Sequence, residues 1–209
     1  MSFLRIPSLL LVGAFLLALG LMSVVGVRVL MAQTPSTPEE VGRQYEEFRS
    51  KPKYVGELNG FTFYPSSTRP SALQGPPACA GSSARWATEG ELLAAGLNFA
   101  PGYQPPGTRQ VGMTGSVCRN EVVSVNRSYS SDRGGFAVTR LAGPPQIREA
   151  APREHLQVAT LDGRAAVISP PVVLKHRMTI WMRDNQSLWT VSCIGIDPQE
   201  CAKIAAEVK

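Results

Sequence analysis

The chain has 209 residues and a formal net charge of +5. This length corresponds to one ordinary domain or two small ones. Its 21 lysines and arginines and 16 acidic residues are dispersed, and no two basic residues are adjacent. The sequence therefore predicts no nucleic-acid partner.

The first feature along the chain is an uncharged apolar run, Ile6–Val27, with Arg5 before it and Arg28 after it. As a helix this run is long enough to cross the ~30 Å hydrocarbon core of a membrane. The alternative is a signal peptide cleaved after Ala32, but the run is longer than a signal core, and Leu30 is larger than the residue that such cleavage prefers. The retained anchor is favoured.

This segment sets the expected location. Residues 1–5 are expected to form a short cytoplasmic tail, residues 6–27 a transmembrane anchor or signal segment, and the remainder is expected outside the cytoplasm. The protein is then a single-pass membrane protein, with a secreted or periplasmic form as the alternative if cleavage occurs near Ala32.

Residues 28–52 are predicted to be a linker followed by a charged amphipathic helix. Thr37 is the expected N-cap and Pro38 the first helical residue. Phe48 belongs to one narrow apolar stripe, which predicts docking on the domain or on a partner.

Residues 53–209 are predicted to form one exported α+β domain, an antiparallel sheet of short hairpins with a C-terminal helix packed on one face. Asn59-Gly60 and Asp162-Gly163 are strong hairpin turns, and a third hairpin is expected to turn at Asn185-Gln186. Asp197 is the expected cap of the final helix, whose apolar stripe faces the sheet.

The four cysteines are predicted to be structural. Cys193 is expected on the inward face of the last strand and Cys201 on the inward face of the last helix, within reach of a disulfide bond. Export favours oxidation, and the chain has no C-x-x-C motif for zinc or redox chemistry. By exclusion Cys79 pairs with Cys118, although four cysteines allow three connectivities.

No sequence motif for catalysis is present: there is no G-x-S-x-G, P-loop, H-E-x-x-H or dinucleotide-binding pattern. The two histidines, His155 and His176, are interpreted as strand-end residues. No cofactor, metal site or catalytic residue is predicted, and the protein is not expected to be an enzyme.

One candidate binding surface is predicted in the third hairpin. In its expected register Trp181 and Thr190 point away from the face that carries Met178, Ile180 and Met182, with Arg183 close by. An exposed tryptophan on a sheet is typical of an interface or ligand platform. The alternative is that a loop or the first helix covers Trp181.

The segment "RMTIWMRDNQSLWTVSCIGIDPQECAKIAAEVK", with "LDGRAAVISPP" upstream, resembles the uncharacterised extracytoplasmic domain of bacterial anti-sigma-factor-like membrane proteins. The resemblance implies an α+β sensor-like or partner-binding domain outside the membrane. Those proteins carry a cytoplasmic sigma-binding segment, whereas only "MSFLR" precedes the apolar run here, so anti-sigma activity is not carried over.

Three functions are consistent with these features. The favoured one is a membrane-anchored, non-enzymatic binding domain outside the cytoplasm, for a partner protein, envelope polymer or lipid. The second is a small single-span accessory subunit of a membrane complex, and the third is a secreted hydrolase that uses His155 or His176.

Overall fold

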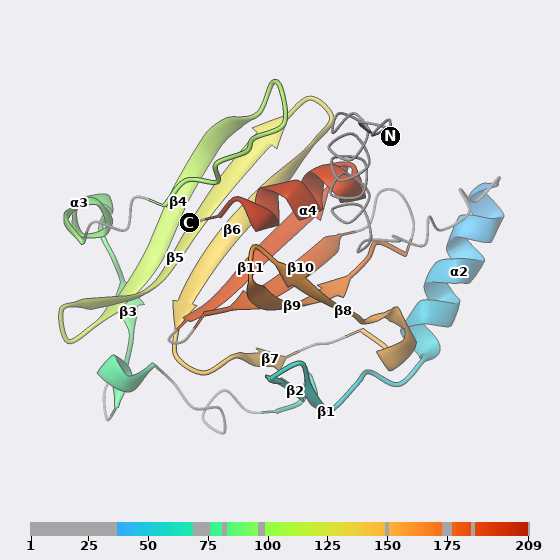
Figure 1. Ribbon diagram of the computed structural model, residues 1–209, viewed down its shortest axis with the longest axis horizontal. Coiled ribbons are helices and arrows are strands. Elements are labelled where there is room, and N and C mark those ends of the chain that lie inside the picture. The colour runs from blue at the N-terminus through green and yellow to red at the C-terminus, as the bar shows by residue number, and fades with distance from the viewer. Residues whose placement is uncertain are drawn as a thin grey trace, which may run out of the picture. The chain divides into compact units, whose positions relative to one another are not determined.

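A computed structural model describes residues 37–68, 76–80, 83–95, 99–148, 151–172, 177–184 and 187–208 (Figure 1). All of them belong to one compact unit, which begins at Ala32. The predicted apolar segment 6–27 lies outside the described residues. Among the helices that are described, none is long and apolar enough to cross a membrane.

The main element is an eight-stranded sheet in which every neighbouring pair is antiparallel. Its strands, in spatial order, are β3 (Arg85–Trp86), β4 (Arg109–Cys118), β5 (Glu121–Ser131), β6 (Gly134–Ala142), β11 (Ser187–Ile194), β10 (Met178–Arg183), β9 (Arg164–Ser169) and β8 (Gln157–Leu161). Two meanders therefore meet where β6 pairs with β11. With the C-terminal helix described below, this sheet confirms the predicted α+β class.

A second, smaller sheet consists of β1 (Gly56–Leu58), β2 (Phe61–Tyr64) and β7 (Gln146–Arg148). The first two strands form the predicted hairpin, in which Leu58 pairs with Phe61. β7 joins β2 in parallel. The parallel pair brings together segments more than eighty residues apart, which no local pattern in the sequence predicts.

Two hairpin turns follow directly from their residues. Asn59 and Gly60 both have positive φ, 52° and 79°, as do Asp162 and Gly163, at 47° and 73°. A two-residue type I′ turn needs positive φ at both positions, which asparagine, aspartate and glycine tolerate best. The Asn59 side chain also donates to the carbonyl of Ala166 at 2.9 Å, which ties the small sheet to the large one.

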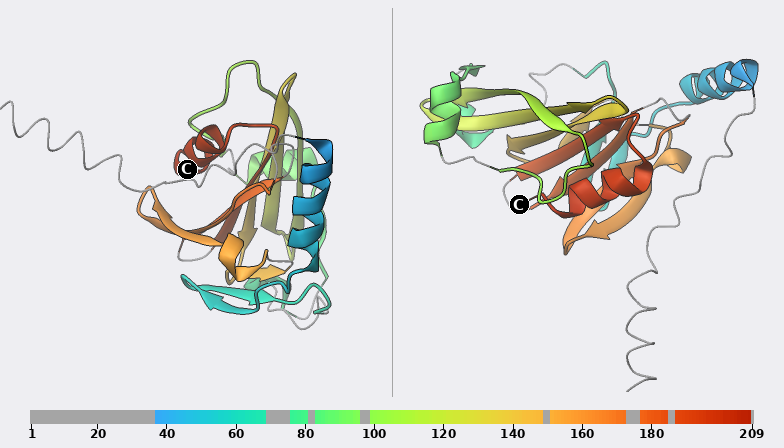
Figure 2. Two further views of the ribbon diagram at one scale, coloured as in Figure 1. Left: turned by 90° about the vertical axis from the view of Figure 1, so that its right-hand side faces the viewer. Right: turned by 90° about the horizontal axis from the view of Figure 1, so that it is seen from above.

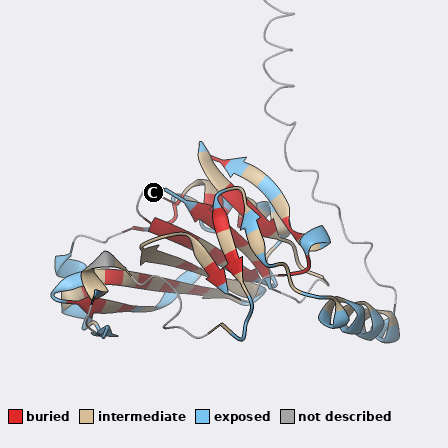
Figure 3. Ribbon diagram, turned by 90° about the horizontal axis from the view of Figure 1, so that it is seen from below, coloured by how far each residue is buried: buried red, intermediate tan, exposed pale blue. Residues whose placement is uncertain are grey.

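The main core lies between one face of the large sheet and helix α4 (Pro198–Ala206). Asp197 caps the helix by accepting from the N–H of Gln199, as predicted. The buried stripe of α4 meets the inward side chains of β10 and β11. The main members of this contact are Met178, Ile180, Met182, Trp189, Val191, Cys193, Cys201, Ile204, Ala205 and Val208. Buried and half-buried positions alternate along β5, as expected for a strand with one face in the core (Figure 3).

Both predicted disulfide bonds are present. Cys193 on β11 is joined to Cys201 on α4, with a Cα–Cα distance of 6.1 Å. Cys79, in the short 3₁₀ helix η2 (Pro77–Cys79), is joined to Cys118 at the end of β4, with a Cα–Cα distance of 5.1 Å. The first bond fixes α4 to the sheet, and the second fixes the proline-rich segment to it.

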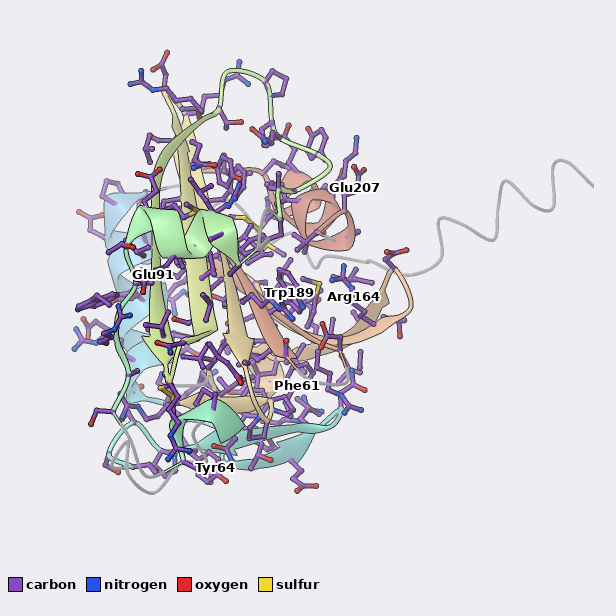
Figure 4. The ribbon with its side chains drawn as sticks, turned by 90° about the vertical axis from the view of Figure 1, so that its left-hand side faces the viewer. Phe61, Tyr64, Glu91, Arg164, Trp189 and Glu207 are labelled. Atoms are coloured by element: carbon purple, nitrogen blue, oxygen red, sulfur yellow. A yellow bond between two sulfur atoms is a disulfide. The ribbon has the colours of Figure 1, made fainter. Side chains whose placement is uncertain are left out.

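Polar contacts hold helices α3 and α4 in place beside the large sheet. Thr88 and Glu91 form a capping box at α3 (Glu89–Ala94), and Arg85 donates to Glu91. These bonds to the carboxylate lower the pKa of Glu91 to about 2, with Arg85 as the main cause. Arg164 on β9 reaches the last turn of α4 and donates to the carbonyl of Ala205 at 3.2 Å (Figure 4).

The opposite face of the large sheet carries a second apolar cluster. Helix α2 (Pro38–Ser50), capped by Thr37 as predicted, lies on this side, so that α2 and α4 are on opposite sides of the sheet (Figure 2). The cluster consists of Phe61, Phe63, Ile147, Ala151, Leu156, Val167, Trp181 and Leu188, with Phe48 packed against it. The apolar stripe of α2 therefore docks on its own domain through Phe48. A short 3₁₀ helix, η3 (Arg153–His155), lies beside that contact.

Candidate functional site

A hollow of about 580 Å³ lies on the face of the large sheet opposite α4. We name it the Trp181 hollow. It lies between the sheet, the end of α2 and the end of β7. Its lining residues are Phe48, Lys53, Ser66, Arg148, Ala151, Ser169, Arg177, Thr179, Trp181, Thr190 and Ser192. Its volume falls in the range of small-molecule sites, roughly 300–1,000 Å³.

The floor of the hollow is set by strand register. Trp181 on β10 pairs with Thr190 on β11, and two residues further along the strands Thr179 pairs with Ser192. Thr179 also pairs with Ser169 on β9. Paired residues of antiparallel strands point to the same face. Three adjacent strands thus present a line of hydroxyl groups beside one tryptophan.

The walls of the hollow bring three cations together from separate segments. Lys53 follows α2, Arg148 ends β7, and Arg177 immediately precedes β10. Among the described lining residues there is no carboxylate to balance them. The hollow therefore has a positive electrostatic potential, which attracts anions.

Lys53 is held against the aromatic wall. Its ammonium group donates to the carbonyl oxygen of Phe48 at 2.9 Å and lies 4.1 Å from the centre of the Phe48 ring. Partial burial is the main cause that lowers the pKa of Lys53, and the charge of Arg49 adds to it, while Glu154 opposes the shift. An anion beside this ammonium group would stabilise its charged form.

The two arginines are available to a ligand to different degrees. One N–H group of Arg148 donates to the carbonyl oxygen of Thr68 at 3.1 Å, which uses one of the five donors of the guanidinium. Arg177 is exposed, and no hydrogen bond or ion pair joins it to another described residue. A planar guanidinium of this kind binds carboxylate and phosphate oxygens in a bidentate manner.

This arrangement can bind a polar, anionic ligand. Serine and threonine hydroxyls both donate and accept hydrogen bonds, and the cations supply charge. The described lining contains no histidine, cysteine or carboxylate that would act as a base. In the described part of the chain, no three His, Cys, Asp or Glu side chains are grouped so that they could hold a metal ion.

The predicted binding surface is corrected in one respect. Trp181 and Thr190 lie on the predicted face, but Trp181 is only 9% exposed, so the prediction of an exposed platform is wrong. Its ring packs edge to face on Phe63, with the ring centres 5.9 Å apart. The small sheet covers it through Phe63, whereas the alternative considered was cover by a loop or the first helix. Trp181 supports the floor of the hollow instead of projecting from the surface.

Arg183 lies away from the hollow. It is at the far end of β10, where its guanidinium covers Gly60 in the hairpin of the small sheet. Glycine is favoured at position 60 by its positive φ of 79°, and a Cβ atom there would also displace the Arg183 guanidinium. Of the three predicted surface residues, the structure brings two together in the hollow.

Sequence reasoning missed most of the lining. Lys53, Arg148 and Arg177 come from loops and strand ends, where no periodic pattern indicates direction. The hydroxyls were open to prediction, because Thr179 and Ser192 share the sheet face of Trp181 in the register that the sequence indicated.

His155 is not among the described residues that line this hollow. His155 is half-buried, and its ring meets the ring of Phe48 edge to face, with centres 5.1 Å apart. Burial, followed by the charge of Lys51, lowers the pKa of His155. His176 lies outside the described residues.

A second hollow, of about 410 Å³, lies at the start of α4 and has mixed charge. Its acidic groups already have partners or structural roles: Asp197 caps α4, and Glu200 accepts from the hydroxyl of Tyr103 at 3.0 Å. Arg133 lies beside Asp132 in its lining. The Trp181 hollow, whose described lining has three cations and no carboxylate, is the stronger candidate site.

No protein-family model matches this chain, and no curated protein is significantly similar to it in sequence. The candidate site therefore depends on the residues and geometry described above.

Proposed function

We propose that the protein is a membrane-anchored, non-enzymatic binding domain outside the cytoplasm, which holds an anionic, oxygen-rich ligand in the Trp181 hollow. The observation that carries this proposal is the composition of the hollow: three cations and five hydroxyl side chains, with no carboxylate among the described lining residues. A hydrated anion that enters it exchanges water for charge-assisted hydrogen bonds.

Two features support the location. The uncharged run Ile6–Val27 has the length of a membrane-spanning helix. The disulfide bonds Cys79–Cys118 and Cys193–Cys201 fit an oxidising compartment, since such bonds are rare where thiols are kept reduced. The anchor holds the hollow at the outer side of the membrane, where it samples ligands of the cell envelope.

The size of the hollow favours an organic anion. A bare inorganic ion would leave most of a 580 Å³ volume to water. The hydroxyls of Ser169, Thr179, Thr190 and Ser192 complement a polyhydroxylated body, because each can donate to or accept from a ligand hydroxyl. An acidic or phosphorylated sugar has both parts, an anion for the arginines and hydroxyls for the floor.

The test compares charged sugars with their neutral parents. Full-length protein in detergent is titrated calorimetrically with galacturonate and galactose, and with glucose 1-phosphate and glucose. We expect at least a tenfold preference for the anionic member of one pair, weakened by salt. The proposal would be contradicted if each neutral sugar bound as tightly as its anionic partner, or if none of the four sugars bound.

Charge variants locate the site. Arg177→Gln and Arg148→Gln are each expected to weaken binding of the anionic sugar by about tenfold to a hundredfold, the usual contribution of a charge-assisted bond. Arg133→Gln is the matched control, because Arg133 is exposed and lies outside the Trp181 hollow. If all three variants bind alike, the anion is held elsewhere.

A second candidate, an accessory subunit of a membrane complex, is favoured by one observation. Trp86 is 79% exposed on β3, the edge strand of the large sheet. Tryptophan is enriched at the centres of protein interfaces. Photo-crosslinking from position 86 in intact membranes tests this function: a single crosslinked protein, lost with Trp86→Ala, would support it, and labelling by solvent alone would contradict it.

A further inference from the structure

The sheet face that forms the floor of the Trp181 hollow continues as a polar surface far beyond it. Trp181 pairs with Thr190 on β11, and Thr190 pairs in turn with Thr139 on β6. Thr139 pairs with Asn126 on β5, which pairs with Thr114 on β4. These five side chains therefore form one row that crosses five adjacent strands on a single face. We name it the central row.

A second row runs parallel to the first. Ser169, Thr179 and Ser192 continue through Ala137 on β6 to Ser128 on β5. Four of its five members carry a hydroxyl group. The sequence of β5 shows the cause, because polar residues alternate there with buried ones such as Val125 and Tyr129.

The polar side chains of the two rows are reachable from solvent and are held in place by one another. Each of these polar side chains is half-buried or exposed. Asn126 donates to the hydroxyl of Thr139 at 2.7 Å and accepts from the hydroxyl of Ser128 at 3.0 Å. Such bonds fix side-chain directions before a ligand arrives, which reduces the entropy lost on binding.

The dimensions suit an extended chain of sugars. Neighbouring strands are about 4.8 Å apart, so the central row from Thr114 to Trp181 extends over about 19 Å. Its polar groups recur at about the length of one sugar residue in an extended glycan. The two rows are about 7 Å apart, the separation of alternate residues along a strand, which allows both edges of a flat sugar ring to be bonded.

Cationic side chains lie at two places on this face. Neither row contains a carboxylate, and Lys53, Arg148 and Arg177 lie at the hollow. At the other side of the face, exposed Arg109 on β4 pairs with Ser130 in the next row. A polymer that carries anions can meet the cations at the hollow, which a neutral polymer cannot do.

We infer that the ligand of the hollow is one residue of a longer acidic polysaccharide, which lies across β11, β6, β5 and β4 along the central row. This inference rests on the proposed function and extends it from a small anion to a polymer segment. Single-stranded nucleic acid is disfavoured, because it is bound by stacking of its bases on exposed aromatic rings. The only aromatic residue in the two rows is Trp181, which is 9% exposed.

The experiment compares a short and a long acidic probe on the full-length protein in detergent. A disaccharide and an octasaccharide of galacturonic acid are titrated, with the neutral galactose octasaccharide as reference. We expect the acidic octasaccharide to bind at least tenfold more tightly than the acidic disaccharide. Equal affinities would show that contacts end at the hollow, and this inference would be overturned.

Variants of central-row residues that do not line the hollow distinguish the two proposals. The pair Thr114→Val and Thr139→Val keeps the shape of β-branched side chains but removes two hydroxyls of the central row. We expect this double variant to bind the acidic octasaccharide about threefold to tenfold more weakly and to bind the acidic disaccharide with unchanged affinity. Thr62→Val, on β2 of the small sheet, is the matched control, with no effect on either probe.

Each remaining outcome has a definite meaning. If Arg177→Gln weakens both probes but the threonine pair weakens neither, the proposed function stands and the polymer inference fails. If Arg177→Gln and Arg148→Gln weaken neither probe, the proposed function itself fails. If a single-stranded oligonucleotide of equal charge displaces the octasaccharide with equal affinity, the assignment to a polysaccharide is overturned.

Discussion

The ring of Phe48 in α2 meets the ring of His155 edge to face, with the ring centres 5.1 Å apart. The same Phe48 ring forms a wall of the Trp181 hollow and contacts the ammonium group of Lys53. Phe48 thus connects α2, the first helix that the structure describes, both to the rest of the domain and to the candidate site.

Protonation of His155 is expected to weaken this contact. Its folded-state pKa lies below the ordinary value of 6.5, chiefly through burial, then through the positive charge of Lys51, with Lys53 adding and Glu154 and Glu47 opposing. The unfolded chain therefore takes up a proton first as the pH falls. Stability is complete above about pH 6.5 and decreases as the pH falls through that value towards the folded-state pKa, by at most about 1.4 kcal/mol per pH unit.

Urea unfolding of the full-length protein at a series of pH values measures this slope. His155→Phe keeps a ring against Phe48 and cannot titrate, so its stability is expected to lose the part of the slope between pH 6.5 and the folded-state pKa. An unchanged slope in this variant would show that another group is responsible.

Trp181 is expected to support the fold as well as the site. Its ring is buried against Phe63 and Leu188, so Trp181→Ala should reduce the free energy of unfolding by about 3–5 kcal/mol. Trp86→Ala is the control, because the exposed ring of Trp86 is expected to contribute less than about 0.5 kcal/mol. Circular dichroism during urea unfolding measures both, and equal losses would contradict the burial of Trp181.

The two disulfide bonds are expected to stabilise to different degrees. Cys79 and Cys118 are 39 residues apart, whereas Cys193 and Cys201 are 8 apart. The loop-entropy relation gives about 4 kcal/mol for the long loop and about 2.5 kcal/mol for the short one. Replacing each pair by serines and measuring urea unfolding tests this order.

The thiol state is checked before those variants are made. Intact mass after thiol labelling, without reduction, is expected to show no labelled cysteine in the native protein. Label on Cys193 or Cys201 would contradict the structural role assigned to that pair.

Local pattern was sufficient to predict the hairpins. Asn59-Gly60 and Asp162-Gly163 specify two-residue turns, and a two-residue turn fixes which residues face each other. The pairings of Leu58 with Phe61 and of Val158 with Val167 follow from these turns. The faces of β10 and β11 were predicted in the same way, because their side chains alternate.

The candidate site was beyond such patterns. Lys53, Arg148 and Arg177 meet only because β7 pairs with β2 and because α2 docks through Phe48. Both contacts join segments distant in the sequence, and their free energy comes from burial of apolar surface, which has no direction. The same contacts cover Trp181, so its exposure could not be judged from strand alternation.

Lys53 provides a direct test of where the ligand lies. Its pKa is below the ordinary value of 10.5, because burial and the charge of Arg49 disfavour the ammonium form. A bound anion favours that form, so saturation with galacturonate is expected to raise the pKa of Lys53, as followed by NMR of the labelled lysine side chains. Lys51 is the internal control, since Glu47 and Glu154 already raise its pKa outside the hollow. A Lys53 pKa that stays constant while galacturonate saturates the protein would place the anion outside the Trp181 hollow.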